Sequence, residues 1–150
     1  MNKIEVIKSE RDGLTVRDMI AHYAEAGWEA IPEDDIQRLK WYGLFLRNPT
    51  PGHFMLRVRL PGGQTTSAQL ETLADIAQQY GNGVVDVTTR QQVQLRHLTI
   101  AHVPSVFSKL EEAGLTSLQT GMDTVRNIMT CPVAGLNPNE LVDGTDIVRA

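Results

Sequence analysis

The segment from Phe54 to Leu60 has a hydrophobic residue at every second position. Because successive side chains of a β-strand point to opposite faces, this alternation predicts a strand that is buried on one side. Arg57 and Arg59 occupy the other side, about 7 Å apart by the rise of a strand. The segment is therefore predicted to present two cationic side chains on one face.

Hydrophobic positions spaced by three and four residues predict helices elsewhere in the chain. These helices cover residues 14–30, 32–41, 68–80 and 103–113. Short apolar and alternating runs predict further strands. They cover residues 84–88, 93–99 and 125–130, and strict alternation in the second of them would place His97 on the same face as Val93 and Leu95.

From residue 54 the predicted order is β-α-β-β-α-β, which is typical of an α+β, ferredoxin-like sandwich. Such a fold has one antiparallel sheet with two helices on one face. The other face would carry Arg57, Arg59 and Arg96 and would be left open. Residues 132–150 show little periodicity and are expected to form a connecting tail.

Composition narrows the class of protein. The chain has 150 residues, with 41% hydrophobic and 21% charged, as in an ordinary folded domain. It contains no apolar run near the ~20 residues that span a membrane, and its first residues lack the apolar core of a secretory signal. The single cysteine, Cys131, excludes an internal disulfide and a cysteine-ligated cluster held by this chain alone.

The formal charge of −4 is distributed unevenly along the chain. Residues 1–35 carry four basic and nine acidic side chains, residues 36–110 carry eight and three, and residues 111–150 carry two and six. A basic segment in an acidic protein favours an anionic ligand. The alternative is that the acidic segments fold against the basic one and neutralise it.

Polar clusters fall at the ends or on the open face of the predicted strands. They are Arg57-Val58-Arg59, Thr88-Thr89-Arg90-Gln91, Gln94-Leu95-Arg96 and Arg126-Asn127. The planar guanidinium binds carboxylates and oxyanions with two parallel hydrogen bonds. Several arginines on one face therefore favour a ligand with more than one negative charge.

Five ordered blocks of sequence carry a family resemblance. They are RLKWYGLF (38–45), FMLRVRLPGGQTTSAQ (54–69), DVTTRQQVQLR (86–96), GLTSLQTGMDTVRNI (114–128) and PVAGLNPNEL (132–141). Together they resemble the amino-terminal part of ferredoxin-dependent nitrite reductases, within the nitrite/sulfite reductase family. The resemblance implies a helical N-terminal extension over residues 1–50, a ferredoxin-like half-domain over 51–131, and a tail over 132–150 leading to a sirohaem and iron–sulfur domain outside this chain.

The resemblance also implies chemistry. Members of the family take electrons from reduced ferredoxin and reduce nitrite to ammonia, with sirohaem and a [4Fe–4S] cluster as cofactors. The cluster ligands would lie outside this chain, and the 150 residues alone are expected to be inactive and colourless. The expected location is the cytoplasm, or the plastid stroma in a plant-type source.

Residue roles follow from the same resemblance. Arg57 and Arg126 match the arginines that bind the substrate anion and are the expected catalytic residues. The expected sirohaem-binding residues are Arg59, Thr88, Thr89, Arg90, Gln94, Arg96 and Asn127. Arg96 stands where sulfite reductases tend to have histidine, which favours nitrite over sulfite. A stand-alone ferredoxin-like module that binds an anion without catalysis remains the alternative.

Overall fold

A computed structural model describes residues 2–149, apart from the side chain of Arg149. Its centre is a four-stranded sheet in the order β1-β2-β4-β3, antiparallel throughout. The strands are β1 (Leu44–Leu46), β2 (His53–Val58), β3 (Val85–Val87) and β4 (Val93–Thr99). The predicted α+β class and the two central strands are thereby confirmed.

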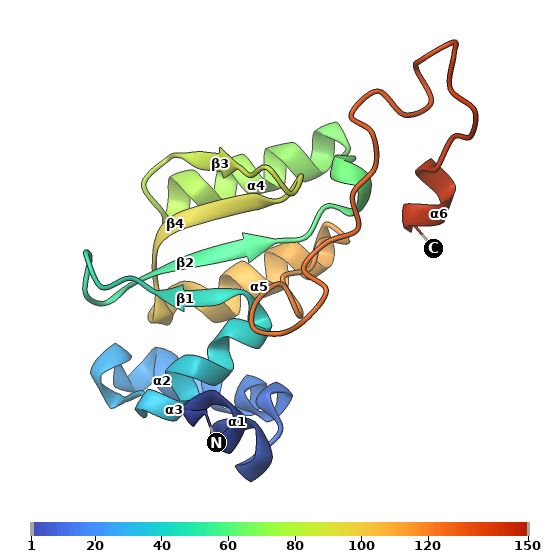
Figure 1. Ribbon diagram of the computed structural model, residues 1–150. Coiled ribbons are helices and arrows are strands. Elements are labelled where there is room, and N and C mark those ends of the chain that lie inside the picture. Colours follow the sequence, from blue (N-terminus) through green and yellow to red (C-terminus); the bar gives the residue numbers. More distant parts are fainter. Residues whose placement is uncertain (1, 150) are drawn as a thin grey trace.

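Two helices, α4 (Ser67–Tyr80) and α5 (Val103–Glu112), cover one face of the sheet (Figure 1). Helix α4 begins with a capping box, in which Thr66 and Gln69 exchange side-chain-to-backbone hydrogen bonds. The apolar side chains of both helices close over the inward side of β2, where Phe54, Leu56 and Val58 are fully buried. The helix-free face, which carries the arginines, is thus left for other contacts.

Short helices of the N-terminal part pack at one end of the sheet (Figure 1). They are α1 (Lys3–Glu10), α2 (Ile20–Ala26) and α3 (Glu33–Arg38), linked by 3₁₀ turns at Gly13–Met19, Trp28–Ala30 and Leu39–Tyr42. The predicted long helix over 14–30 is therefore broken into pieces, and α1 was not predicted because its apolar positions are few. Val16, Ile20 and Leu39 join the same core as the sheet.

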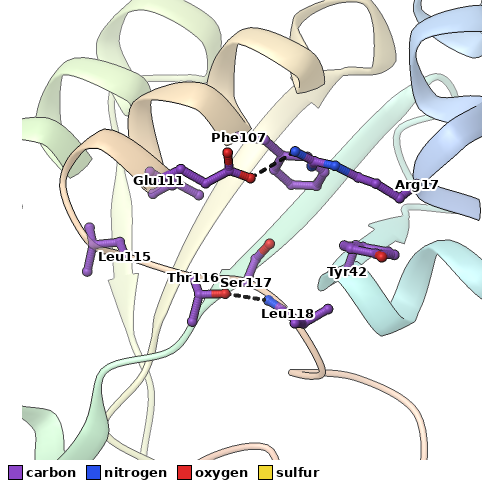
Figure 2. Close-up of a pocket in the computed structure, with 9 residues that line it drawn as sticks. Arg17, Tyr42, Phe107, Glu111, Leu115, Thr116, Ser117 and Leu118 are labelled. Atoms are coloured by element: carbon purple, nitrogen blue, oxygen red, sulfur yellow. Dashed lines mark hydrogen bonds and ion pairs between the residues drawn. The ribbon is translucent and has the colours of Figure 1, made fainter. Parts of the chain in front are cut away.

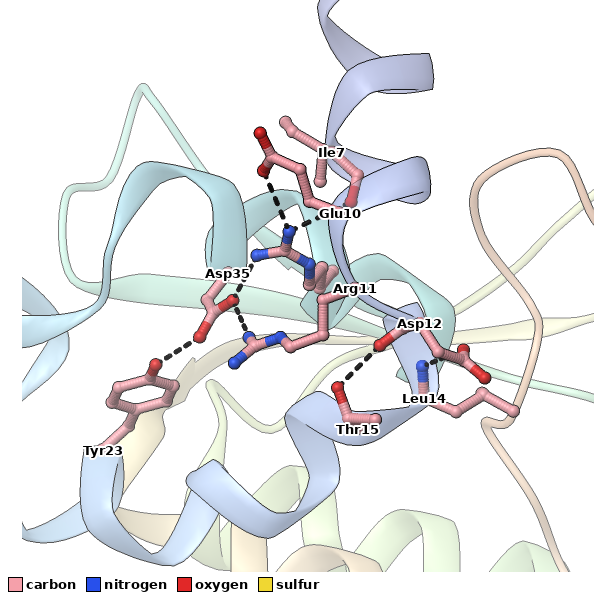
Figure 3. A network of polar contacts seen from close by, with 9 residues as sticks. Ile7, Glu10, Arg11, Asp12, Leu14, Thr15, Tyr23 and Asp35 are labelled. Atoms are coloured by element: carbon pink, nitrogen blue, oxygen red, sulfur yellow. Dashed lines mark hydrogen bonds and ion pairs between the residues drawn. The ribbon is translucent and has the colours of Figure 1, made fainter.

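A buried set of charged and polar side chains ties these helices together (Figure 3). The Asp35 carboxylate accepts hydrogen bonds from Arg11, from Nη1 of Arg38 at 2.8 Å and from the Tyr23 hydroxyl at 2.5 Å. Nη2 of Arg38 also donates to the Ile7 carbonyl at 3.0 Å, which holds α1 in place. We call Tyr23, Asp35, Arg11 and Arg38 the Asp35 network.

The predicted strand over residues 125–130 is wrong, because those residues form no strand. The edge of β2 that it would have occupied is taken by β1, from the N-terminal part, and then by a single bridge between Arg59 and Thr116. Once β1 has paired with β2, the backbone groups that a later strand needs are already bonded. Periodicity within one segment carries no information about which segment reaches that edge.

The prediction for His97 is also wrong. Its φ of 61° interrupts the strand, and the pairing of β2 with β4 shifts by one residue between Phe54 and Leu56. Such a bulge turns the following residues over, so Leu98 is buried while His97 is exposed.

The C-terminal residues lead away from the sheet and end in the short helix α6 (Thr145–Arg149) (Figure 1). Their large apolar side chains, including Leu136 and Leu141, are exposed. None of the helices within residues 2–149 has the length and apolar composition needed to cross a membrane.

Candidate functional site

The Arg57 side chain projects from the helix-free face of β2 and is half-buried. Its Nη1 donates to the Thr120 carbonyl at 2.7 Å, and its guanidinium carbon lies 4.9 Å from the centre of the Phe45 ring. Thr120 in turn donates its hydroxyl to the Arg57 carbonyl at 3.1 Å. These contacts fix the direction of the side chain while leaving other guanidinium N–H groups for a ligand.

Arg59, two residues further, is held by the loop that follows α5. Its Nη2 donates to the carbonyls of Gln119 and Val125 at 2.8 and 2.9 Å. The loop therefore crosses the face that was expected to be open. The arginines of β2 contact backbone carbonyls there, and they are less exposed than the sequence suggested.

Residues 126–130 are fastened to the β3–β4 hairpin by side-chain amides. Nδ2 of Asn127 donates to the carbonyls of Leu60 and Arg90 at 2.9 and 2.8 Å. Nε2 of Gln92 donates to the Arg126 carbonyl at 2.5 Å, and Gln91 bonds the backbone of Thr130. Arg126, which lies 69 residues after Arg57 in the chain, is thus brought to the same end of the sheet.

Two further arginines act on Arg57 from this end. Burial lowers the pKa of Arg57, and the positive charges of Arg126 and Arg90 lower it further. Arg90 and Arg126 line one open cavity of about 320 Å³ together with Asn127. We call Arg57, Arg90 and Arg126 the arginine cluster.

The arginine cluster has no carboxylate partner among the side chains that the structure describes. Arg57 is half-buried, while Arg90 and Arg126 are exposed. Like charges near one another repel, and an anion that binds between them removes that repulsion. The alternative in which acidic segments neutralise the basic one therefore does not apply to these three residues.

Thr88 and Thr89 lie in the turn between β3 and β4. The Thr88 hydroxyl oxygen accepts hydrogen bonds from the backbone N–H groups of Arg90 and Gln92, at 3.3 and 3.2 Å. Thr88 therefore shapes the turn that presents Arg90. Thr89 is exposed beside it.

Gln94 and Arg96 lie further along β4. Gln94 is paired in register with both Arg57 and Asp86, so it lies between the arginine cluster and an acidic residue. Arg96 donates from Nε to the Asp86 carboxylate and from Nη2 to Gln94 at 3.3 Å. Unlike the arginine cluster, Arg96 already has an anionic partner from its own chain.

The residues at this end fit a ligand that carries several carboxylates. Beyond the arginine cluster, Nε of Arg59 and Oδ1 of Asn127 are buried without a hydrogen-bond partner among the described residues. Both side chains line a cavity of about 630 Å³ formed with Pro61, Ile128 and Val148. A ligand carboxylate could accept a hydrogen bond from Nε of Arg59, whereas Oδ1 of Asn127 is itself an acceptor and needs a donor. Residues 2–149 contain no group of three His, Cys, Asp or Glu side chains placed to hold a metal ion.

A third cavity, of about 200 Å³, lies between the N-terminal helices and α5 (Figure 2). Arg17 lies over the Phe107 ring at 4.5 Å and bonds Glu111 at 2.8 Å. Its charge is therefore already compensated, and the cavity is a junction between two parts of the fold.

Sequence reasoning named Gln91 in a polar cluster but gave it no role, and it missed Gln92 and Asp86. The charge pair of Asp86 and Arg96 could have been found, because these residues lie on the two predicted strands, 84–88 and 93–99, that residues 89–92 join. The two glutamines carry no such signal, since a glutamine before a strand is common and its partners lie more than 30 residues away.

Comparison with known proteins agrees with this geometry. Residues 47–113 match the family model described as the nitrite/sulfite reductase ferredoxin-like half domain. The chain is 47% identical, over 99% of its length, to a protein of Leptolyngbya laminosa named ferredoxin–nitrite reductase. It is 50% identical over its whole length to a protein of the same name from Synechococcus elongatus. It spans 30% of the length of both.

The fold is also similar to a solved structure. The NirA protein of Mycobacterium tuberculosis superposes with a TM-score of 0.91 at 28% identity, over 99% of this chain and 30% of that one. The N-terminal helices, the sheet and the C-terminal segment are thus arranged together as in one part of a longer protein.

Proposed function

This chain belongs to the nitrite/sulfite reductase family, and we propose that it is the N-terminal part of a ferredoxin-dependent nitrite reductase. The observation that carries the proposal is the arginine cluster, three converging guanidinium groups with no carboxylate partner among the described side chains. Its proposed activity is the reduction of nitrite to ammonia with electrons from reduced ferredoxin.

Arg57 and Arg126 are the proposed catalytic residues. Nitrite is a small oxyanion, and two guanidinium groups can bind its oxygens and stabilise the negative charge that develops as N–O bonds break. The Thr120 carbonyl fixes Arg57, and Gln92 fixes the backbone of Arg126. Electrostatic groups fixed before the substrate arrives lose little free energy to reorganisation.

The proposed sirohaem-binding residues surround this pair. They are Arg59, Thr88, Thr89, Arg90, Gln94, Arg96 and Asn127. When bound, sirohaem supplies the iron at which nitrite accepts electrons. Arg90 offers charge-assisted hydrogen bonds to its carboxylates, and Nε of Arg59 is a buried donor that lacks a partner among the described residues. Arg96 would divide its hydrogen bonds between Asp86 and the cofactor.

The remaining proposals concern the longer protein. We place the helical extension at residues 1–50, the half-domain at 51–131 and the tail at 132–150, with the ligands of a [4Fe–4S] cluster beyond the tail. The proposed locations are the cytoplasm and, for a plant-type source, the plastid. In their support, a spinach relative 44% identical over 95% of this chain is named as the chloroplastic ferredoxin–nitrite reductase.

The test is to express the full reading frame that contains this sequence and to assay the purified product. We expect a sirohaem absorption spectrum and consumption of nitrite with reduced ferredoxin, at a higher kcat/KM than sulfite. A coloured product that reduces sulfite but not nitrite would assign the chain to a sulfite reductase. A colourless product that binds anions without reducing them would support the binding-module alternative instead.

A further inference from the structure

Gln92 lies at the junction of β4 with the segment that carries Arg126. Only 1% of the residue is exposed, which is unusual for a glutamine. A buried amide is costly unless its hydrogen bonds are made. Its Nε2 donates to the Arg126 carbonyl at 2.5 Å, across 34 residues of sequence.

The backbone of Gln92 is itself fixed. Thr88 accepts a hydrogen bond from the Gln92 N–H through its hydroxyl at 3.2 Å, and the Thr88 N–H donates to the Gln92 carbonyl at 2.9 Å. The Gln92 side chain therefore extends from a turn whose backbone is held by hydrogen bonds. Its bond to the Arg126 carbonyl holds the Arg126 backbone at a fixed place relative to that turn.

Arg126 needs such a fastening for an electrostatic reason. Arg90 and Arg126 line the same cavity, and the charges of both act on Arg57, so like charges repel each other at this place before an anion binds. Residues 125–130 form no strand, and the backbone of Arg126 has no regular ladder of hydrogen bonds to resist that repulsion. The Gln92 amide supplies one of the few contacts that hold this residue in place.

We propose that Gln92 is a positioning residue that holds the Arg126 guanidinium beside Arg57 in the absence of substrate. The inference rests on the proposed function, because it concerns how the nitrite-binding pair is assembled. Gln92 does not touch the substrate. Its contribution is to keep a cationic group where mutual repulsion would otherwise move it, and it acts only through Arg126.

The experiment uses the full-length reductase with Gln92→Met, which keeps the length of the side chain and removes the amide donor. The matched control is Gln64→Met, because Gln64 donates an amide hydrogen bond to Thr145 at 3.2 Å and does not line the cavity that holds Arg90 and Arg126. The first readout is hydrogen exchange of the peptide spanning residues 124–131. We expect faster exchange there in Gln92→Met and no change in Gln64→Met.

The second readout is kinetic. Small displacements of a positioning group can cost up to about a hundredfold, and we expect the KM for nitrite to rise about tenfold in Gln92→Met with sirohaem content and spectrum unchanged. In an Arg126→Ala background, Gln92→Met should add no further loss, because residues that act through one another are not additive.

Unchanged exchange in Gln92→Met would overturn the proposal, and so would an equal loss of kcat/KM with and without Arg126. Loss of sirohaem from Gln92→Met would also overturn it, because Gln92 would then support cofactor binding. Failure of the proposed function looks different: the unsubstituted reductase would not reduce nitrite, while the exchange experiment would still report on the Gln92 contact.

Discussion

The Asp35 network and the arginine cluster both bring arginines together, but they balance the charge differently. In the Asp35 network, Arg11 and Arg38 share one buried carboxylate from their own chain. In the arginine cluster, Arg57 contacts the Thr120 carbonyl, and its nearest charged neighbours are also cations. Arginines that pair with a carboxylate of their own chain indicate a role in stability. Arginines without such a partner among the described side chains indicate a place for an external anion.

The pKa values reflect the same contrast. Burial opposes ionisation of Asp35, but hydrogen bonds from Tyr23, Arg38 and Arg11 outweigh it and hold the pKa of Asp35 below its usual range. Burial and the Asp35 charge raise the pKa of Tyr23 to about 12. In the arginine cluster, burial and the charges of Arg126 and Arg90 all disfavour the charged form of Arg57. A bound anion would reverse that effect.

The largest effect is expected from Asp35→Asn. The substitution leaves the buried Arg38 without a full counter-charge, and breaking a buried pair from one side costs about 3–5 kcal/mol. Chemical denaturation of the chain measures this loss in the free energy of unfolding. Asp34→Asn is the matched control, since Asp34 lies in the same first turn of α3 and makes no ion pair among the described side chains. Equal destabilisation by both substitutions would refute the special role of the Asp35 network.

The pH dependence of stability sharpens that result. Because the pKa of Asp35 is lower in the folded state, its contribution is present above the unfolded pKa of about 3.9 and is lost as the pH falls through the folded value. The wild type should therefore lose more stability than Asp35→Asn as the pH falls from 5 through the folded pKa of Asp35. Parallel curves of unfolding free energy against pH for the two proteins would contradict this.

Arg57→Gln tests the arginine cluster in the full-length reductase. Removing one fixed electrostatic donor commonly lowers kcat about 10²–10³-fold, or about 2.7–4 kcal/mol. Arg47→Gln is the control, because Arg47 follows β1 and lines a different cavity. Steady-state turnover of nitrite is the measurement. Full activity in a correctly folded Arg57→Gln protein would remove Arg57 from the catalytic pair.

Citrate binding tests the arginine cluster in this chain alone. A polycarboxylate that binds only the folded state adds about 2.7 kcal/mol at 100 times its Kd. Thermal unfolding in citrate should therefore shift upward relative to chloride at the same ionic strength. The shift should disappear in the Arg57→Gln, Arg126→Gln double variant. Equal midpoints in the two salts would mean that the cluster is not an organised anion site.

The smallest effect is expected at the junction shown in Figure 2. Arg17 and Glu111 are both partly exposed, with side-chain exposures of 39% and 66%. Exposed ion pairs contribute about 0–1 kcal/mol. Arg17→Ala should therefore destabilise the chain by less than about 1.5 kcal/mol even with the loss of its contact to Phe107. Chemical denaturation of Arg17→Ala and of the wild type, at low and at high salt, would measure this loss of unfolding free energy. A larger loss would mean that the junction contributes as much to stability as the Asp35 network.

The sequence alone determined the features that depend on neighbouring residues. The alternation at 54–60 predicted β2 and its two faces, and the spacing at 68–80 and 103–113 predicted α4 and α5. The excess of basic residues over 36–110 favoured an anionic ligand, and Arg57, Arg90 and Arg126 were all among the predicted site residues. Periodicity and charge are local properties of a chain, so they can be determined from the sequence without knowledge of the fold.

Only the tertiary structure decided the features that depend on distant partners. It placed β1 at the edge expected for residues 125–130, paired Arg96 with Asp86, and joined Gln92 to Arg126. An edge strand is chosen by competition among segments for the same backbone groups, and a side-chain amide finds its acceptor only when two remote segments meet. The physical reason is that each of these contacts depends on the arrangement of the whole fold. The residue pattern of one segment reflects only the secondary structure which that segment favours.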